Sequence, residues 1–281
     1  MLKEMLLSKT TTNSKFYILH STFKKEPTME RIESTKNIRI KNAKKLHTRK
    51  GREKLGSFLI EGEHLVEEAL KWNVIINEIY VEENFNIPSK WEIKDVPIYL
   101  VNDKIMKEIC ETETPQGVVA VCELIGRKPL QLEKNGKYLL IDQVQDPGNL
   151  GTMIRTADSV GVSAVILGNG TVDIYNSKVM RSTQGSLFHL PVVKGELVEW
   201  VEKFKEAQIP IYGTALNDEA KAYKEVQEQE SFALIVGNEG SGVTEELLRL
   251  TTENLYIPSY GHAESLNVSI ATGILLYHLR K

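Results

Sequence analysis

The 281-residue sequence predicts an α/β protein with two domains, a smaller N-terminal one and a larger C-terminal one built on a mostly parallel sheet. The main observation is that short β-branched or apolar runs alternate with segments of helical apolar spacing throughout the C-terminal half. Such alternation is typical of a parallel sheet covered by helices on both faces. A second observation is the stretch Gly126–Lys137, whose Pro129, two glycines and weak apolar pattern predict a linker between the domains.

The composition is that of a globular protein, with 41% hydrophobic and 26% charged residues. No apolar run approaches the ~18 residues of a bilayer-spanning helix, so we expect no membrane contact. The only cysteines, Cys110 and Cys122, have apolar neighbours and predict reduced, buried thiols rather than a disulfide. These features favour a cytoplasmic protein. None of the six histidines forms a metal-ligand spacing with another His or Cys, so we expect no metal site.

The charge is distributed unevenly along the chain. Residues 1–56 hold 15 Lys/Arg against 5 Asp/Glu, a net charge of +10, whereas the rest of the chain has a net charge of −13. A basic end on an acidic body indicates local contact with a polyanion, although a solvated basic arm explains the charge alone equally well. Residues 1–28 are polar and unpatterned and predict a disordered extension, and Met29 is an alternative translation start.

The N-terminal domain is expected over residues 29–125. A basic helix over residues 36–56 should be followed by a turn at Gly51, and Asp103 should cap a later helix. The other expected elements are strands at 58–61, 76–81, 97–101 and 116–122 and helices at 63–71 and 104–110.

The C-terminal domain is expected over residues 138–281, after the linker of residues 126–137. In a parallel sheet of this kind, ligands bind beyond the C-terminal ends of the strands. We expect strands at 138–144, 164–167, 190–193, 209–214, 232–236 and 255–257, and helices at 150–160, 177–184, 197–207, 245–250 and 266–279.

The first segment at these strand ends covers residues 142–162. The turn sequence Asp146-Pro147-Gly148 follows a buried strand, and Asn149 is placed to cap the next helix. Arg155 lies off the apolar face of that helix, close to the expected crevice. Taken alone, Arg155 has the features of an ordinary surface arginine.

The second segment covers residues 234–243, where an apolar strand runs into Gly237, Gly240 and Gly242. Glycines allow a ligand to approach the backbone closely. The spacing matches neither a dinucleotide-binding loop nor a P-loop. Glu239 would repel a phosphate but suits a cationic or hydroxyl-bearing ligand, while a plain tight turn also explains the segment.

The third segment covers residues 257–279. Pro258 breaks a strand, and Glu264, Ser265 and Asn267 stand at the start of a long apolar helix, where free backbone N–H groups can bind acceptors. Ser265 alone is explained as a cap. Asn267 needs a partner, because a polar amide so early in an apolar helix is costly to leave unpaired.

Together these segments closely resemble the signature motifs of the SpoU (TrmH) family, in the SPOUT class of RNA methyltransferases. NLGTMIRTAD, IVGNEGSGV and IPSYGHAESLNVSIATGILLY have the order and spacing of that family, over roughly residues 137–281. Residues 29–125 resemble the small L30e-like substrate-binding domain that often precedes the catalytic domain. The resemblance implies a deep trefoil knot in the C-terminal domain, a rare exception to normal chain topology. It also implies a homodimer through that domain, to which the helix over residues 266–279 would contribute.

The resemblance implies S-adenosyl-L-methionine as the cofactor and S-adenosyl-L-homocysteine as the product, without a metal. The cofactor would lie bent in the knot and be held largely by backbone groups. Gly237, Ile257 and Leu266 match the family's cofactor contacts, and Thr214 and Ala215 are expected to line the same pocket. Where the family commonly has methionine this chain has Ser259, which could alter packing beside the cofactor.

The family's usual reaction is methylation of a ribose 2′-hydroxyl, and Arg155 matches the arginine assigned to activating that hydroxyl. An arginine is a poor base, since its pKa exceeds ~12. We therefore expect Arg155 to stabilise the forming alkoxide or to grip the adjacent phosphate. Asn149, Glu239, Ser265 and Asn267 match the family's residues that position substrate and cofactor.

The basic N-terminal region is then interpreted as a contact for RNA, with ribosomal RNA favoured and transfer RNA open. The candidates for binding phosphate are Lys44, Lys45, Arg49, Lys50 and Arg52.

Two other functional classes compete with this hypothesis. A catalytically inactive knotted RNA-binding or ribosome-assembly factor is disfavoured, because the matched polar residues are intact; binding of S-adenosylmethionine would separate the two. A nucleotide-dependent oxidoreductase or NTPase is disfavoured because the glycine-rich phosphate-binding motifs are missing.

Overall fold

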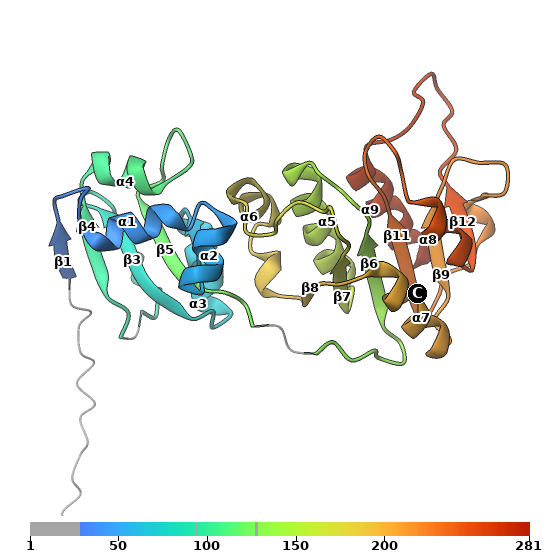
Figure 1. Ribbon diagram of the computed structural model, residues 1–281, viewed down its shortest axis with the longest axis horizontal. Helices are drawn as coiled ribbons and strands as arrows, with labels where there is room; N and C mark the ends of the chain where they lie inside the picture. The colour runs from blue at the N-terminus through green and yellow to red at the C-terminus, as the bar shows by residue number, and fades with distance from the viewer. Residues whose placement is uncertain (1–28, 94, 127–128) are drawn as a thin grey trace, which may run out of the picture.

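The computed structural model describes residues 29–93, 95–126 and 129–281. The disorder expected for residues 1–28 falls outside these ranges. Each half of the chain builds its own sheet, and the two sheets lie side by side along the long axis of the molecule (Figure 1). The predicted α/β fold with a smaller N-terminal domain is therefore confirmed.

The N-terminal domain is a mixed five-stranded sheet in the order β1-β4-β3-β5-β2. Strands β1, β4 and β3 are parallel, whereas β5 is antiparallel to both of its neighbours. The edge strand β1 was not expected, because its MERI sequence is mostly polar and only its last residue is buried. The elements are β1 (Met29–Ile32), α1 (Ile38–Lys45), α2 (Arg49–Leu55), β2 (Ser57–Glu61), α3 (Glu63–Lys71), β3 (Ile76–Glu82), β4 (Ile98–Val101), α4 (Asp103–Ile109) and β5 (Val118–Glu123).

The expected single basic helix is two helices, α1 and α2, that meet at a sharp corner (Figure 1). Thr48 begins α2, and its side chain accepts a hydrogen bond from the Gly51 N–H at 3.1 Å. Gly51 is therefore inside α2 and not in a turn. A Cβ at this position would lie 1.8 Å from the carbonyl oxygen of Lys45, so the corner requires a residue without a side chain.

Two predicted N-caps were wrong, because in each case another residue caps the helix. Asn102, not Asp103, caps α4, with its side chain accepting from the Ile105 N–H at 3.0 Å. Asp146, not Asn149, caps the helix after the first strand of the C-terminal domain, because the helix starts earlier, at a proline. Proline suits the first helical position, where its missing N–H has no intrahelical partner to lose.

The C-terminal domain is a seven-stranded, entirely parallel sheet in the order β10-β12-β9-β11-β6-β7-β8. The strands β7 and β11 are buried along their whole length, which accounts for their uninterrupted apolar sequences. The edge strand β10 was not expected, because it has two residues only. The elements are β6 (Lys137–Ile141), α5 (Pro147–Val160), β7 (Ala164–Leu167), α6 (Ser177–Thr183), η1 (Ser186–Phe188), β8 (Val192–Lys194), α7 (Leu197–Glu206), β9 (Ile211–Thr214), β10 (Lys221–Ala222), η2 (Tyr223–Glu225), β11 (Phe232–Val236), α8 (Glu245–Leu250), β12 (Glu253–Tyr256) and α9 (Val268–Leu279).

One apolar core extends across the boundary between the domains. Phe58 and Leu65 of the N-terminal domain belong to the same buried cluster as Leu150 and Leu187 of the C-terminal domain. The ring of Phe58 lies 4.7 Å from that of Tyr175, centroid to centroid. Because burial of apolar area is the main favourable term in association, this shared core holds the domains in one arrangement.

A charged contact adds to this interface. The imidazole of His189 lies between two carboxylates, with Nδ1 2.7 Å from Asp158 and Nε2 3.0 Å from Glu68 on α3. Burial acts to raise the pKa of Glu68, but hydrogen bonds from His189 and Lys71 outweigh it, so that the pKa of this carboxyl lies below its ordinary value. The carboxylate therefore remains ionised in the interface.

Cys110 and Cys122 are free and buried, as predicted. Burial raises the pKa of the Cys110 thiol to about 12 and that of Cys122 further, which makes both unreactive. Among the described residues no helix is long and apolar enough to cross a membrane, and no group of three or more His, Cys, Asp or Glu is placed to hold a metal. The trefoil knot stays a prediction, because strand order and register do not record how the chain threads.

Candidate functional site

The sheet topology brings the three sequence segments together. Strands β12, β9, β11 and β6 are consecutive and parallel, so their C-terminal ends lie at one edge of the sheet. The segments that follow β6, β11 and β12 are those singled out in the sequence. The end of β9 supplies Thr214 and Ala215 between them.

Asn149, in the first turn of α5, connects all three segments. Its side-chain N–H donates to Glu239 Oε1 at 3.0 Å. Its side-chain oxygen accepts from the Asn267 amide and from the Ser269 hydroxyl, each at 2.9 Å. A side-chain amide has both donors and an acceptor, and here both ends are used.

Glu239 is held by the loop that it faces. Its carboxylate also accepts the backbone N–H groups of Gln145 and Asp146, at 3.2 and 3.1 Å. Burial acts to raise the pKa of Glu239, but these hydrogen bonds and that from Asn149 outweigh it and lower the pKa. The carboxylate is thus a fixed anion that positions the loop before α5, and it is a poor proton acceptor near neutral pH.

Asn267 is the N-cap of α9, and its side-chain oxygen accepts from the Ser269 N–H at 2.9 Å. The expectation that this amide needs a partner is confirmed by its contact with Asn149. Ser265 is exposed and makes no hydrogen bond with the described residues. Ser269, buried in the first turn of α9, makes the hydroxyl contact with Asn149, and the role predicted for Ser265 stays a prediction. The sequence signal for Ser269 was available, since a serine in so apolar a helix also requires a partner.

The glycine loop after β11 folds back on itself at Gly237. Asn238 and Gly242 exchange backbone hydrogen bonds at 3.0 Å. A Cβ on Gly237 would lie 2.0 Å from the carbonyl carbon of Gly242 and 2.1 Å from the nitrogen of Val243. The loop therefore requires glycine at 237 because of this close backbone approach.

The expected cofactor positions have free backbone groups. The N–H and C=O groups of Gly237, Ile257 and Leu266 make no hydrogen bond to any residue that the structure describes. Thr214 and Ala215 are partly exposed beside them, at the end of β9. Unpaired donors and acceptors at neighbouring strand ends fit a ligand with several polar groups, as S-adenosylmethionine has. Ser259, in the same loop, donates to the carbonyl of Ala263 at 2.9 Å and leaves Ile257 accessible.

Arg155 lies two turns into α5 and is exposed. Its guanidinium makes no hydrogen bond or ion pair with the described residues. The side chain is thus available to an anionic group from outside the chain.

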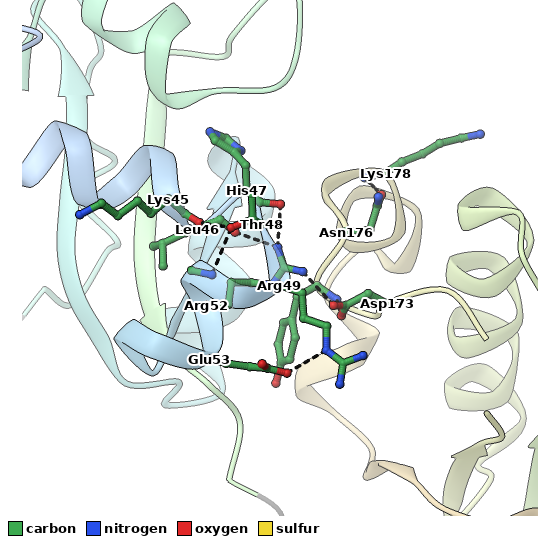
Figure 2. Close-up of polar contacts among 12 residues, drawn as sticks. Lys45, Leu46, His47, Thr48, Arg49, Arg52, Glu53, Asp173, Asn176 and Lys178 are labelled. Carbon is green, nitrogen blue, oxygen red and sulfur yellow. Dashed lines mark hydrogen bonds and ion pairs between the residues drawn. The ribbon is translucent and has the colours of Figure 1, made fainter. Parts of the chain in front are cut away.

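The basic candidates of the N-terminal domain differ in their surroundings (Figure 2). Lys44 and Arg49 are exposed and paired with Glu108 and Glu53, respectively, whereas among the described residues the ammonium of Lys45 bonds Asn42 alone. Lys50 is exposed and has no partner among the residues described.

Arg52 does not fit the expected role as a surface contact for RNA. Its side chain is buried and directed towards the C-terminal domain, where it pairs with Asp173 at 2.8 Å (Figure 2). An arginine so enclosed cannot reach a phosphate without breaking that contact.

Comparison with known proteins gives the same assignment for both halves of the chain. Residues 136–277 match the SpoU rRNA methylase family, and residues 37–120 match the MRM3-like substrate-binding domain. The chain is 54% identical to the 23S rRNA (guanosine(2553)-2'-O)-methyltransferase RlmP of Bacillus subtilis (strain 168), over 90% of this chain and 100% of that protein.

Solved structures agree over the same length. An AdoMet-bound rRNA methyltransferase from Sinorhizobium meliloti, AdoMet being S-adenosylmethionine, superposes with a TM-score of 0.78 at 30% identity. The superposition covers 89% of this chain and 97% of that one. An RNA 2'-O ribose methyltransferase also gives 0.78 at 30% identity, over 89% and 98% of the two chains.

We predict that Gly237→Ala abolishes binding of S-adenosylmethionine, because the added methyl group displaces the loop that is expected to form part of the cofactor pocket. Gly240→Ala is the matched control, since its nearest neighbour would be the Asn238 side chain at an ordinary 3.6 Å. Isothermal titration measures the affinity of both variants. Equal affinities in Gly237→Ala and Gly240→Ala would contradict the assignment of this loop.

Proposed function

We propose a specific reaction for this chain, which belongs to the SpoU rRNA methylase family: transfer of a methyl group from S-adenosylmethionine to a ribose 2′-hydroxyl of 23S ribosomal RNA. The observation that supports it most is the Asn149 amide, which ties the three motif segments together on the helix that also carries Arg155. Support for the acceptor comes from the name of the Bacillus subtilis relative, a guanosine 2'-O-methyltransferase.

When bound, S-adenosylmethionine supplies a methyl group that its sulfonium makes electrophilic. The residues of the chain must then hold the ribose hydroxyl in line and stabilise the charge left by its proton. Glu239 is occupied by three donors and does not serve as the base. Arg155, on the same helix as Asn149, has no partner among the described residues, and we assign it to the forming alkoxide or the neighbouring phosphate.

The N-terminal domain, with boundaries at residues 29–125 and a linker at 126–137, is proposed to bind the RNA. Lys45 and Lys50 are the strongest candidates for phosphate contacts, because neither is committed to a carboxylate. Lys44 and Arg49 can exchange their exposed carboxylate partners for phosphate, since exposed ion pairs contribute only about 0–1 kcal/mol. Because the Bacillus subtilis relative is named for 23S rRNA, which in a bacterium lies in the cytoplasm, we place this chain in the cytoplasm too.

We also propose a homodimer that forms through α9. Ile270 and Tyr277 are 56% and 60% exposed, and with the half-buried Gly273 and Ile274 they form one apolar stripe at helical spacing. Helix α5, with Arg155, packs beside α9, so a partner on this stripe would lie close to the site. The knot implied by the family resemblance belongs to the same domain.

Arg155→Ala is expected to lower the rate of methyl transfer roughly a hundredfold, the effect of removing one preorganised donor. Affinity for S-adenosylmethionine and thermal stability should not change, because Arg155 contacts neither the expected cofactor positions nor the core. Arg249→Ala, which removes an exposed pair on α8, is the control. Radiolabelled methyl transfer to unmodified 23S rRNA gives the rates, and a near-normal rate would remove Arg155 from the mechanism.

Replacing Lys45 and Lys50 together by glutamine should weaken RNA binding and flatten its dependence on salt. Each lost phosphate contact reduces the slope of log K against log salt by about 0.7–0.9. Lys134→Gln, at an exposed lysine of the linker, is the control. Filter binding over a salt series is the measurement, and an unaltered slope would argue against this surface.

Ile270→Asp is expected to convert a dimer of the whole chain into monomers, because a carboxylate cannot be buried unpaired in an apolar interface. Sedimentation equilibrium distinguishes the two masses. A monomeric unmodified chain, or an unaffected dimer in the variant, would rule out this face.

A further inference from the structure

Arg52 is a buried cation at the boundary between the domains. Its Nη1 donates to the carbonyl oxygens of Leu46 and His47, at 2.8 and 3.0 Å, and its Nη2 donates to Asp173 at 2.8 Å. Leu46 is the C-cap of α1. The guanidinium therefore binds the end of α1 on one side and the C-terminal domain on the other (Figure 2).

Asp173 is equally fixed within the loop between β7 and α6. Its second oxygen accepts from the Tyr175 N–H at 3.0 Å, and the Tyr175 ring packs on Phe58 of the N-terminal domain. Burial acts to raise the pKa of Asp173, but the hydrogen bonds from Tyr175 and Arg52 outweigh it and lower the pKa. An ion pair that is buried in this way is strongly unfavourable to break from one side.

The loop of Asp173 is followed by α6, and α6 packs on α5, the helix that carries Asn149. Helix α6 lies so close to α5 that a Cβ on Gly151 would be 2.4 Å from the Cβ of Ser182. Lys178 on α6 contacts Asp146 at 3.3 Å, and Asp146 is the N-cap of α5. Asn149 follows in the first turn of α5.

On the other side, Arg52 lies on the helix that is proposed to contact RNA. Lys50 precedes it by two residues on α2, and Lys45 ends α1, whose last carbonyls Arg52 binds. A displacement of Arg52 would therefore move both lysines relative to α5.

We infer that Arg52 is a positioning residue for methyl transfer: through Asp173 and α6 it fixes the RNA-binding corner of α1 and α2 relative to Asn149 and Arg155. This inference rests on the proposed function. The contact between Arg52 and Asp173 determines where the bound ribose lies. The affinities for RNA and for S-adenosylmethionine depend on other residues. Lysine cannot replace Arg52, because one ammonium does not reproduce a planar fork that reaches two carbonyls and a carboxylate.

The test compares Arg52→Lys, Asp173→Asn and the double variant with the unmodified chain. Single-turnover methylation of unmodified 23S rRNA transcribed in vitro is measured at saturating RNA and S-adenosylmethionine, together with both affinities. The rate constant should fall at least about tenfold in each single variant, since small misplacements of a reacting group are costly. Both affinities should stay within about threefold. The double variant should be no slower than the slower single variant, because both changes break one interaction.

A merely structural role gives a different result. It would lower the fraction of active protein, and hence the amplitude, while leaving the rate constant within about twofold of that of the unmodified chain; that outcome overturns the inference. A rate loss that follows a loss of S-adenosylmethionine affinity also overturns it. Arg249→Lys, in an exposed pair on α8, serves as the control for arginine replacement.

Hydrogen exchange without RNA separates this inference from the proposed function. Amides of α6 and of residues 147–152 should exchange faster in Asp173→Asn than in the unmodified chain, while those of α8 remain unchanged. Unchanged exchange over residues 147–152 would overturn the coupling even if the protein methylates the RNA. Absence of methylation by the unmodified chain would instead reject the proposed function.

Discussion

The amide of Asn149 is the interaction on which the rest of the site depends. It joins α5 to Glu239, Asn267 and Ser269, residues that lie 90, 118 and 120 positions away in the chain. The parallel sheet brings these segments to one edge, and the amide then fixes them relative to one another. Neither aspartate nor alanine could substitute: aspartate offers no donor to Glu239 and would place two carboxylates together, and alanine would leave several polar groups unpaired.

Within this network the carboxylate of Glu239 is not free to act as a base. Glu239 has donors on both oxygens and a lowered pKa, so its charge serves to hold the loop before α5. Arg155, exposed on the same helix as Asn149, has no partner among the described residues. A reaction that starts from an already electrophilic methyl group needs placement and charge stabilisation more than it needs a strong base. In the reaction that we propose, the Asn149 network would supply the placement and Arg155 the charge stabilisation.

Local rules were enough to predict much of the fold, whereas features that depend on tertiary contact were missed. Alternating apolar patterns were sufficient for the parallel sheet, and the cost of an unpaired amide was sufficient to predict a partner for Asn267. Asp146 replaced Asn149 as a cap because both residues satisfy the same local preference, and the helix start at Pro147 decides between them. The sequence spacing could not predict that Gly51 lies inside α2. Glycine is required there because the carbonyl oxygen of Lys45 lies so close to the Gly51 backbone. Arg52 was misassigned because its partner lies 121 residues away.

Two arginines of α2 have different roles because one is exposed and the other is buried. Arg49 and Arg52 are three residues apart on α2, and each is paired with a carboxylate. The exposed pair with Glu53 is weak and can be exchanged for an RNA phosphate at little cost. The pair with Asp173 is costly to exchange, because separating its charges would leave the guanidinium of Arg52 buried without its anion. The same basic segment therefore holds an exposed pair, which we propose is exchanged for RNA phosphate, and a buried pair, which we infer keeps this surface aligned with the reaction centre.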